Sequence, residues 1–149
     1  MKIIFVCSGN TCRSPLAESI AKSLLPHDSI ASRGLFAVEG QAISKESLEL
    51  IHKYDLPEPS RAQAFHIDDL DADIILTMTQ AHKDLIFSMY GRQSNVFTLN
   101  EYVGDTQEID DPFGGSFDVY EQTYTKIYDL VDKIKFKHEK SKIYIISIC

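Results

Sequence analysis

The chain has 149 residues, of which 44% are hydrophobic, which is enough for one domain with one sizeable core. Its formal net charge of −7 argues against general binding to nucleic acid or to anionic membranes. No stretch reaches the roughly twenty apolar residues of a membrane span, and the histidines are scattered without the spacing of a zinc site. We therefore expect a single domain over residues 1–149 that is monomeric and needs no metal or cofactor.

The cysteine content and the N-terminus favour a reducing compartment. The three cysteines are an odd number, which does not suggest a framework of disulfides. The N-terminal apolar run lacks the length and flanking residues of a secretion signal. The expected location is the cytoplasm.

The N-terminal stretch predicts a buried strand, a polar loop and a helix in direct succession. Apolar, β-prone residues at 3–6 precede a loop that contains Gly9, which is typical of a buried parallel strand. After the loop, Ser14 can cap a helix, Pro15 fits its first position, and apolar residues repeat at i, i+4 and i+8. The loop therefore joins the C-terminal end of a strand to the N-terminus of a helix.

This loop is suited to bind an oxyanion and to activate Cys7. Inward-pointing N–H groups and the helix dipole both favour an anion such as inorganic phosphate or a phosphoryl group. The same field, with the charge of Arg13, favours a nucleophilic Cys7 thiolate. Arg13 can bind two phosphoryl oxygens, and the Ser14 hydroxyl can donate to the thiolate. A buried structural cysteine beside a surface arginine is the alternative, but the whole context favours the functional interpretation.

Strands and helices alternate along the rest of the chain. A strand over 29–34 leads into a loop in which Leu35 and Phe36 either wall a substrate cleft or belong to the core. The acidic stretch 68–73 lacks the pattern of a calcium loop, so a solvated turn is expected. The other predicted elements are a helix over 44–54, a strand over 73–78, a helix from Thr79 to Gly91 with Leu85, Ile86 and Met89 buried, a strand over 95–99 and a helix over 116–137.

This alternation predicts an α/β fold, namely a doubly wound parallel sheet of four strands with helices on both faces. The phosphate-binding loop, or P-loop, follows the first strand. The apolar segment 143–149 at the chain end is expected to pack against the long preceding helix, and no function is assigned to it.

Attack of a Cys7 thiolate on a phosphoryl group also needs a proton donor, because expelling an alkoxide, phenoxide or amine requires a proton at the leaving atom. The loop 110–115 follows the fourth strand, at the same sheet edge as Cys7, and its Gly and Pro content lets it fold over a cleft. Asp111 is the predicted acid. The neighbouring Asp110 either raises the proton affinity of Asp111 by repulsion between like charges or faces solvent, and the second is the favoured expectation. Asp111 then acts as the base that activates water to hydrolyse a phosphocysteine, without a metal.

The signature of the low-molecular-weight protein tyrosine phosphatases is similar to one segment of this chain, Val6-Cys7-Ser8-Gly9-Asn10-Thr11-Cys12-Arg13-Ser14-Pro15. Related segments occur at Ser32-Arg33-Gly34, at Ala72 to Met78 and at Asp111-Pro112-Phe113-Gly114-Gly115. The resemblance implies a small α/β phosphatase whose P-loop binds phosphorylated protein substrates through the residues between Cys7 and Pro15. It also implies that Asn10 stabilises the loop and that the aspartate before proline, Asp111, is the acid, while Gly9 permits close approach of the backbone.

Two departures from the family pattern concern the substrate. Thr11 stands where many tyrosine phosphatases carry isoleucine, and only Phe113, not two aromatic residues, follows Asp-Pro. The motif then resembles the bacterial branch that acts on protein phosphoarginine. A hydroxyl near the leaving group suits a guanidinium better than a phenol, and Asp111 can pair with that cation. Phosphoarginine is therefore the favoured substrate, and phosphotyrosine is the alternative.

Cys12 has two interpretations. It lies five residues after Cys7 on the same loop, so a reversible disulfide between them can protect the nucleophile from overoxidation. Alternatively, it is a small residue that packs the loop.

Two other functional classes are less favoured. An arsenate reductase on a similar scaffold would need further cysteines, which residues 73–99 lack. A phosphocysteine carrier protein would not need Asp111 to activate water.

Overall fold

The computed structural model describes residues 1–148, with side chains through residue 141. Four strands form one parallel sheet in the order β2-β1-β3-β4. Their bounds are β1 Lys2–Cys7, β2 Ser29–Gly34, β3 Ile74–Thr77 and β4 Val96–Thr98. Strand β1 lies between β2 and β3, and Cys7 at its end pairs in register with Gly34. The expected α/β fold with four parallel strands is confirmed.

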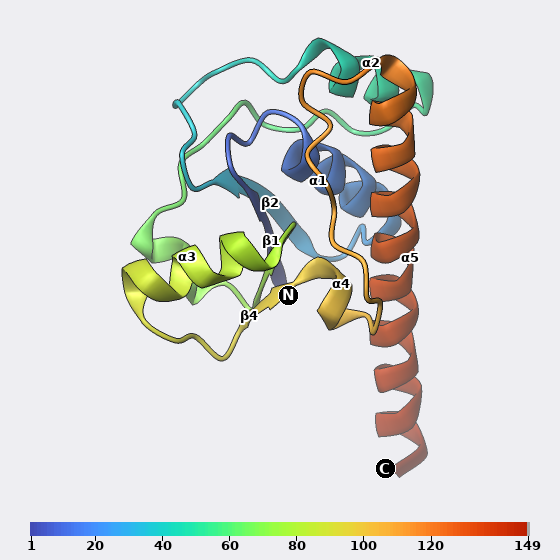
Figure 1. Ribbon diagram of the computed structural model, residues 1–149. Helices are drawn as coiled ribbons and strands as arrows, with labels where there is room; N and C mark the ends of the chain where they lie inside the picture. Colours follow the sequence, from blue (N-terminus) through green and yellow to red (C-terminus); the bar gives the residue numbers. More distant parts are fainter. Residues whose placement is uncertain (149) are drawn as a thin grey trace.

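Helices cover both faces of the sheet (Figure 1). The helices are α1 (Arg13–Leu24), α2 (Lys45–Lys53), a 3₁₀ helix (Ile67–Asp71), α3 (Gln80–Tyr90), α4 (Leu99–Tyr102) and α5 (Phe117–Ile148). Successive residues of β1 point to opposite faces, as in any strand. Ile3 and Phe5 belong to the core that β1 shares with α1 and α5, whereas Ile4 and Val6 belong to a second core with Ile86 of α3. This two-sided burial explains why residues 3–6 are uniformly apolar.

Several helix boundaries follow the expected signals. Ser44 caps α2 by accepting a hydrogen bond from the N–H of Ser47, and Thr79 caps α3 in the same way from His82. Gly91 ends α3 with a φ of +82°, a conformation that favours glycine. The acidic stretch forms the 3₁₀ helix, and the described residues contain no cluster suited to hold a metal ion.

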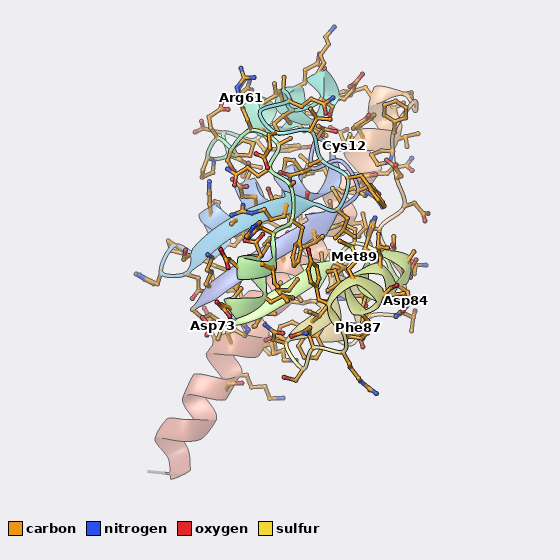
Figure 2. All side chains as sticks on the ribbon, turned by 90° about the vertical axis from the view of Figure 1, so that its left-hand side faces the viewer. Cys12, Arg61, Asp73, Asp84, Phe87 and Met89 are labelled. Carbon is orange, nitrogen blue, oxygen red and sulfur yellow. The ribbon has the colours of Figure 1, made fainter. Side chains whose placement is uncertain are left out.

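Two local predictions are wrong. Ser14 is not the cap of α1, because the helix begins at Arg13, its cap position is Cys12, and no side chain makes a capping hydrogen bond there. The Ser14 hydroxyl instead lies against Cys7. Met89, labelled on α3 in Figure 2, is 52% exposed rather than buried. The buried stripe of α3 runs through His82 and Ile86 to the partly buried Tyr90 at intervals of four residues, so Met89 falls at its edge.

Helix α5 is longer than expected. It continues through Ile148, so residues 143–148 extend this helix instead of folding back against it (Figure 1). The last turns project away from the sheet in both views. The packing predicted for the side chains of this segment, and Cys149, lie outside the described residues. Within the part of the chain that the structure covers, no helix combines the length and apolar character needed to cross a membrane.

Candidate active site

The loop between β1 and α1 is held in shape by Asn10. This residue is fully buried and adopts a left-handed conformation with a φ of +55°. Its amide nitrogen donates to the hydroxyls of Ser14 (2.7 Å) and Ser32 (2.9 Å), and its oxygen accepts from the N–H of Gln63 (2.9 Å). Asparagine tolerates this backbone conformation better than most residues. Its three hydrogen bonds tie the loop to α1, to β2 and to the segment before the 3₁₀ helix.

The end of β2 presses directly on the same loop. A Cβ atom on Gly34 would lie 2.7 Å from both the nitrogen of Asn10 and the oxygen of Ser8, so only glycine fits without a shift. The N–H of Leu35 donates to the oxygen of Cys7 (3.0 Å), and the N–H of Phe36 donates to the oxygen of Ser8 (2.8 Å). The backbone of β2 and the residues after it therefore fix the backbone of the loop.

Neither Leu35 nor Phe36 lines the cavity over Cys7. Leu35 packs against the core beneath α3, which is the second of the two roles considered for these residues. Phe36 is 70% exposed, so it is not part of the core, and it is not among the residues that line the cavity over Cys7.

A cavity of about 260 Å³ opens at the C-terminal end of β1. Its walls are Cys7, Ser8, Gly9, Thr11, Cys12, Arg13, Asp111 and Phe113, all of which were predicted site residues. The two other predicted residues, Asn10 and Ser14, are fully buried behind it. The sulfur of Cys7 lies 2.9 Å from the hydroxyl oxygen of Ser14, where the hydroxyl can donate to a thiolate. The cavity therefore combines a thiol with a ready hydrogen-bond donor.

Arg13 and Asp111 place opposite charges at this cavity. Arg13 is buried in the first turn of α1, and its Nη1 donates to the carbonyl oxygen of Ile109 (2.9 Å). Its Nη2 lies 3.8 Å from Oδ2 of Asp111, whose side chain is 55% exposed. The other oxygen of Asp111 accepts from the N–H of Phe113 (3.0 Å). The arginine is thus fixed beneath the cavity, while the exposed carboxylate lies at its mouth.

Sequence analysis missed a third group at this edge, His82. The ring is buried, with Nε2 2.9 Å from the Ser8 hydroxyl and Nδ1 3.0 Å from the Thr79 hydroxyl. Burial, and then the charge of Arg13, lower its pKa to about 4, so the ring is neutral at pH 7. Its position three residues after the helix cap Thr79, at the edge where the strand ends meet, is the signal that could have found it.

Glu18 of α1 is a second buried polar group that the sequence did not reveal. Its carboxylate is fully buried, accepts hydrogen bonds from Ser32 (2.5 Å) and from the N–H of Ser60 (2.9 Å), and pairs with Lys22 (2.7 Å). Because Ser32 also accepts from Asn10, this network reaches the loop from behind. Fully paired buried charges of this kind fix one arrangement of their neighbours.

Cys12 is a buried free thiol in the structure, as is Cys7. Its sulfur lies 3.8 Å from the Thr11 hydroxyl and 3.8 Å from the hydroxyl of Tyr120 on α5. Both cysteines line the same cavity. The packing contact is therefore visible, and the disulfide with Cys7 stays a prediction.

Comparison with known proteins gives a consistent result. Residues 2–142 match the family model of low molecular weight phosphotyrosine protein phosphatase. The chain is 53% identical over 135 residues to the low molecular weight protein-tyrosine-phosphatase PtpB of Staphylococcus haemolyticus, covering 91% of this chain and 98% of that protein. It is 36% identical over 149 residues to a protein-arginine-phosphatase of Bacillus subtilis, covering 95% and 99% of the two chains.

A solved structure shares the fold closely. It is a mutant YwlE arginine phosphatase with a phosphorylated active site serine, and it superposes with a TM-score of 0.89 at 35% identity. The match covers 94% of this chain and 97% of that one.

Proposed function

The chain belongs to the low molecular weight phosphotyrosine protein phosphatase family, and we propose that Cys7, Arg13 and Asp111 carry out its reaction on protein phosphoarginine. The observation that carries the reaction is the shared cavity, in which a thiol, a buried guanidinium and an exposed carboxylate meet. No metal takes part in the proposed steps.

In the first step, the Cys7 thiolate attacks the phosphorus atom of a phosphoryl group that Arg13 and the loop N–H groups hold. The S–P bond forms as the bond from phosphorus to the leaving atom breaks. Asp111 delivers its proton to that atom, so no negative charge develops on the leaving group as it departs. Its position at the cavity mouth, 3.8 Å from Arg13, supports this role.

In the second step, the phosphocysteine is hydrolysed. The Asp111 carboxylate takes a proton from water, the water oxygen attacks phosphorus, and the S–P bond breaks to release phosphate. The Ser14 hydroxyl, 2.9 Å from the sulfur, stabilises the departing thiolate. The phosphorylated active site serine of the mutant arginine phosphatase supports a covalent phosphoenzyme by analogy.

The choice of phosphoarginine depends on Thr11. This residue lines the cavity beside Cys12, and Phe113 is the aromatic residue at the rim, 81% exposed. The guanidinium of phosphoarginine has several N–H groups, and the oxygens of Thr11 and Asp111 can accept hydrogen bonds from them. An isoleucine would leave such donors unpaired, whereas it would suit the apolar ring of phosphotyrosine.

Matched phosphoarginine and phosphotyrosine peptides test this choice. We expect a higher kcat/KM for phosphoarginine in the wild type, and a shift toward phosphotyrosine in Thr11→Ile. Equal ratios in the two enzymes would refute the role of Thr11, and a wild-type preference for phosphotyrosine would favour the activity by which PtpB is named. Steady release of inorganic phosphate distinguishes hydrolysis from an arsenate reductase or a phosphocysteine carrier.

A further inference from the structure

A second cavity of about 490 Å³ adjoins the one over Cys7. The two share Thr11, Cys12 and Phe113, so they are continuous around these side chains. The rest of the second cavity is walled by the loop before α2 together with the first turn of that helix, by the loop after Phe113 and by Tyr120 of α5. A phosphorylated side chain in the first cavity therefore brings its neighbours in the polypeptide beside the second.

The wall formed by α2 is bonded to the P-loop itself. The N–H of Ser44 donates to the oxygen of Thr11 (2.9 Å), and the hydroxyl of Ser47 donates to the oxygen of Cys12 (3.4 Å). Ser44 is also the cap of α2. These bonds hold the first turn of α2 at a fixed position relative to Cys7. Figure 2, in which Cys12 is labelled, shows this residue on the side of the sheet near α2.

Glu46, in that first turn, gives the second cavity its charge. Among the residues that line the cavity it is the one with a fully charged side chain, and no lysine or arginine lies among them. Glu46 is half-buried and takes part in none of the ion pairs or side-chain hydrogen bonds within the described part of the chain. By contrast, the carboxylate of Glu121 on α5 is paired with Lys53 (2.6 Å). An unpaired carboxylate in a cavity is available to a cation from outside.

Tyr120 on the opposite wall stays a neutral polar group. Burial, the contact with Cys12 and the charge of Glu46 all raise the pKa of its hydroxyl. It therefore adds hydrogen-bonding capacity to the cavity without adding charge.

We propose that this second cavity binds an arginine or lysine side chain of the protein substrate, located within two residues of the phosphorylated residue, with Glu46 as its ion-pair partner. The net charge of −7 further attracts basic segments over longer distances. The proposal rests on the reaction at Cys7, but it holds for either phosphoarginine or phosphotyrosine. It assigns to the enzyme a preference for sequence around the phosphorylated residue.

The test uses phosphopeptides that differ only at the positions flanking the phosphorylated residue, which carry lysine, glutamine or glutamate in turn. For the wild type, lysine at one of these positions should lower KM by about three- to fivefold relative to glutamine, as a partly exposed ion pair would. The change should appear in KM with little change in kcat, because the contact is remote from the reacting atoms. Glu46→Gln should abolish this preference, and Glu46→Lys should reverse it toward glutamate.

Glu49→Gln is the matched control, since this carboxylate lies on the same helix but is exposed and does not line the cavity. It should retain the lysine preference. Affinities of Cys7→Ala for the same peptides test the subsite without transfer of the phosphoryl group. An unchanged preference in Glu46→Gln, or its absence in the wild type, would overturn the proposal, while turnover of the glutamine peptide would still support the reaction at Cys7.

Discussion

Replacing Gly34 with alanine moves the P-loop without touching a group that takes part in the chemistry. The φ of Gly34 is not in the left-handed region, so alanine brings no backbone strain of its own. Its Cβ, however, would lie 2.7 Å from the nitrogen of Asn10, where ordinary contact begins at 3.4 Å. The difference, 3.4 − 2.7 = 0.7 Å, is the shift required of the P-loop backbone atoms that this Cβ would contact.

A displacement of this size should lower kcat/KM markedly. A misplacement of about 1 Å can cost about 100-fold in rate, so we expect a loss between about 10-fold and 100-fold. The assay is phosphate release from a phosphopeptide, with thermal unfolding measured in parallel. Gly91→Ala is the control: its positive φ of 82° at the end of α3 predicts a loss of stability of about 1–3 kcal/mol but no change in the P-loop.

Activity of Gly34→Ala within twofold of the wild type would refute the reasoning. It would mean that the contact between β2 and the loop does not set the geometry at Cys7. An equal loss of activity in Gly91→Ala would assign the effect to general destabilisation instead.

Three other predictions concern single groups of the site. Asp111→Asn should lower kcat on phosphopeptides by about 10²- to 10⁴-fold, and by less on aryl phosphates with good leaving groups; an equal loss on both would count against its role as the acid. After mild peroxide treatment, mass spectrometry should find a reducible Cys7–Cys12 disulfide in the wild type, whereas Cys12→Ser should lose its activity irreversibly. Sulfinic acid on Cys7 without a disulfide to Cys12 would exclude protection by Cys12. The pKa of His82 is about 4 in the folded protein and 6.5 ordinarily. Between these two pH values the unfolded state therefore binds a proton that the folded state does not. The free energy of unfolding should fall by roughly 3 kcal/mol as the pH drops through that range. Urea unfolding of His82→Asn should lack this part of the pH dependence, and an unchanged dependence would contradict the buried neutral ring.

The part of the site that was predicted from sequence is local or follows from the topology. Cys7 and Arg13 flank one short loop, so their residue types and spacing were enough. Asp111 is far away in sequence, yet parallel strands bring the loops at their C-terminal ends to one edge of the sheet. The structure gathers all three around one cavity.

What the sequence did not reveal depends on tertiary contacts. Polar helix residues are usually exposed, whereas His82 is buried against the P-loop residue Ser8 and Glu18 is buried against Ser60. The end of α5 was missed for a different reason. Charged residues from Lys135 to Lys142 interrupt the apolar pattern, but lysine and glutamate are good helix formers, so the helix continues past the end that the pattern predicts.

The central claim is that the phosphoryl group is transferred to Cys7 before it reaches water. The direct test is rapid acid quench of Asp111→Asn reacting with an aryl phosphate that has a good leaving group, followed by mass spectrometry of the protein. The phosphorylated intermediate should accumulate, because this variant lacks the base that activates water to hydrolyse it. The account predicts phosphate on Cys7, and none in Cys7→Ala. Phosphate on any other residue, or turnover by Cys7→Ala at the wild-type rate, would contradict it.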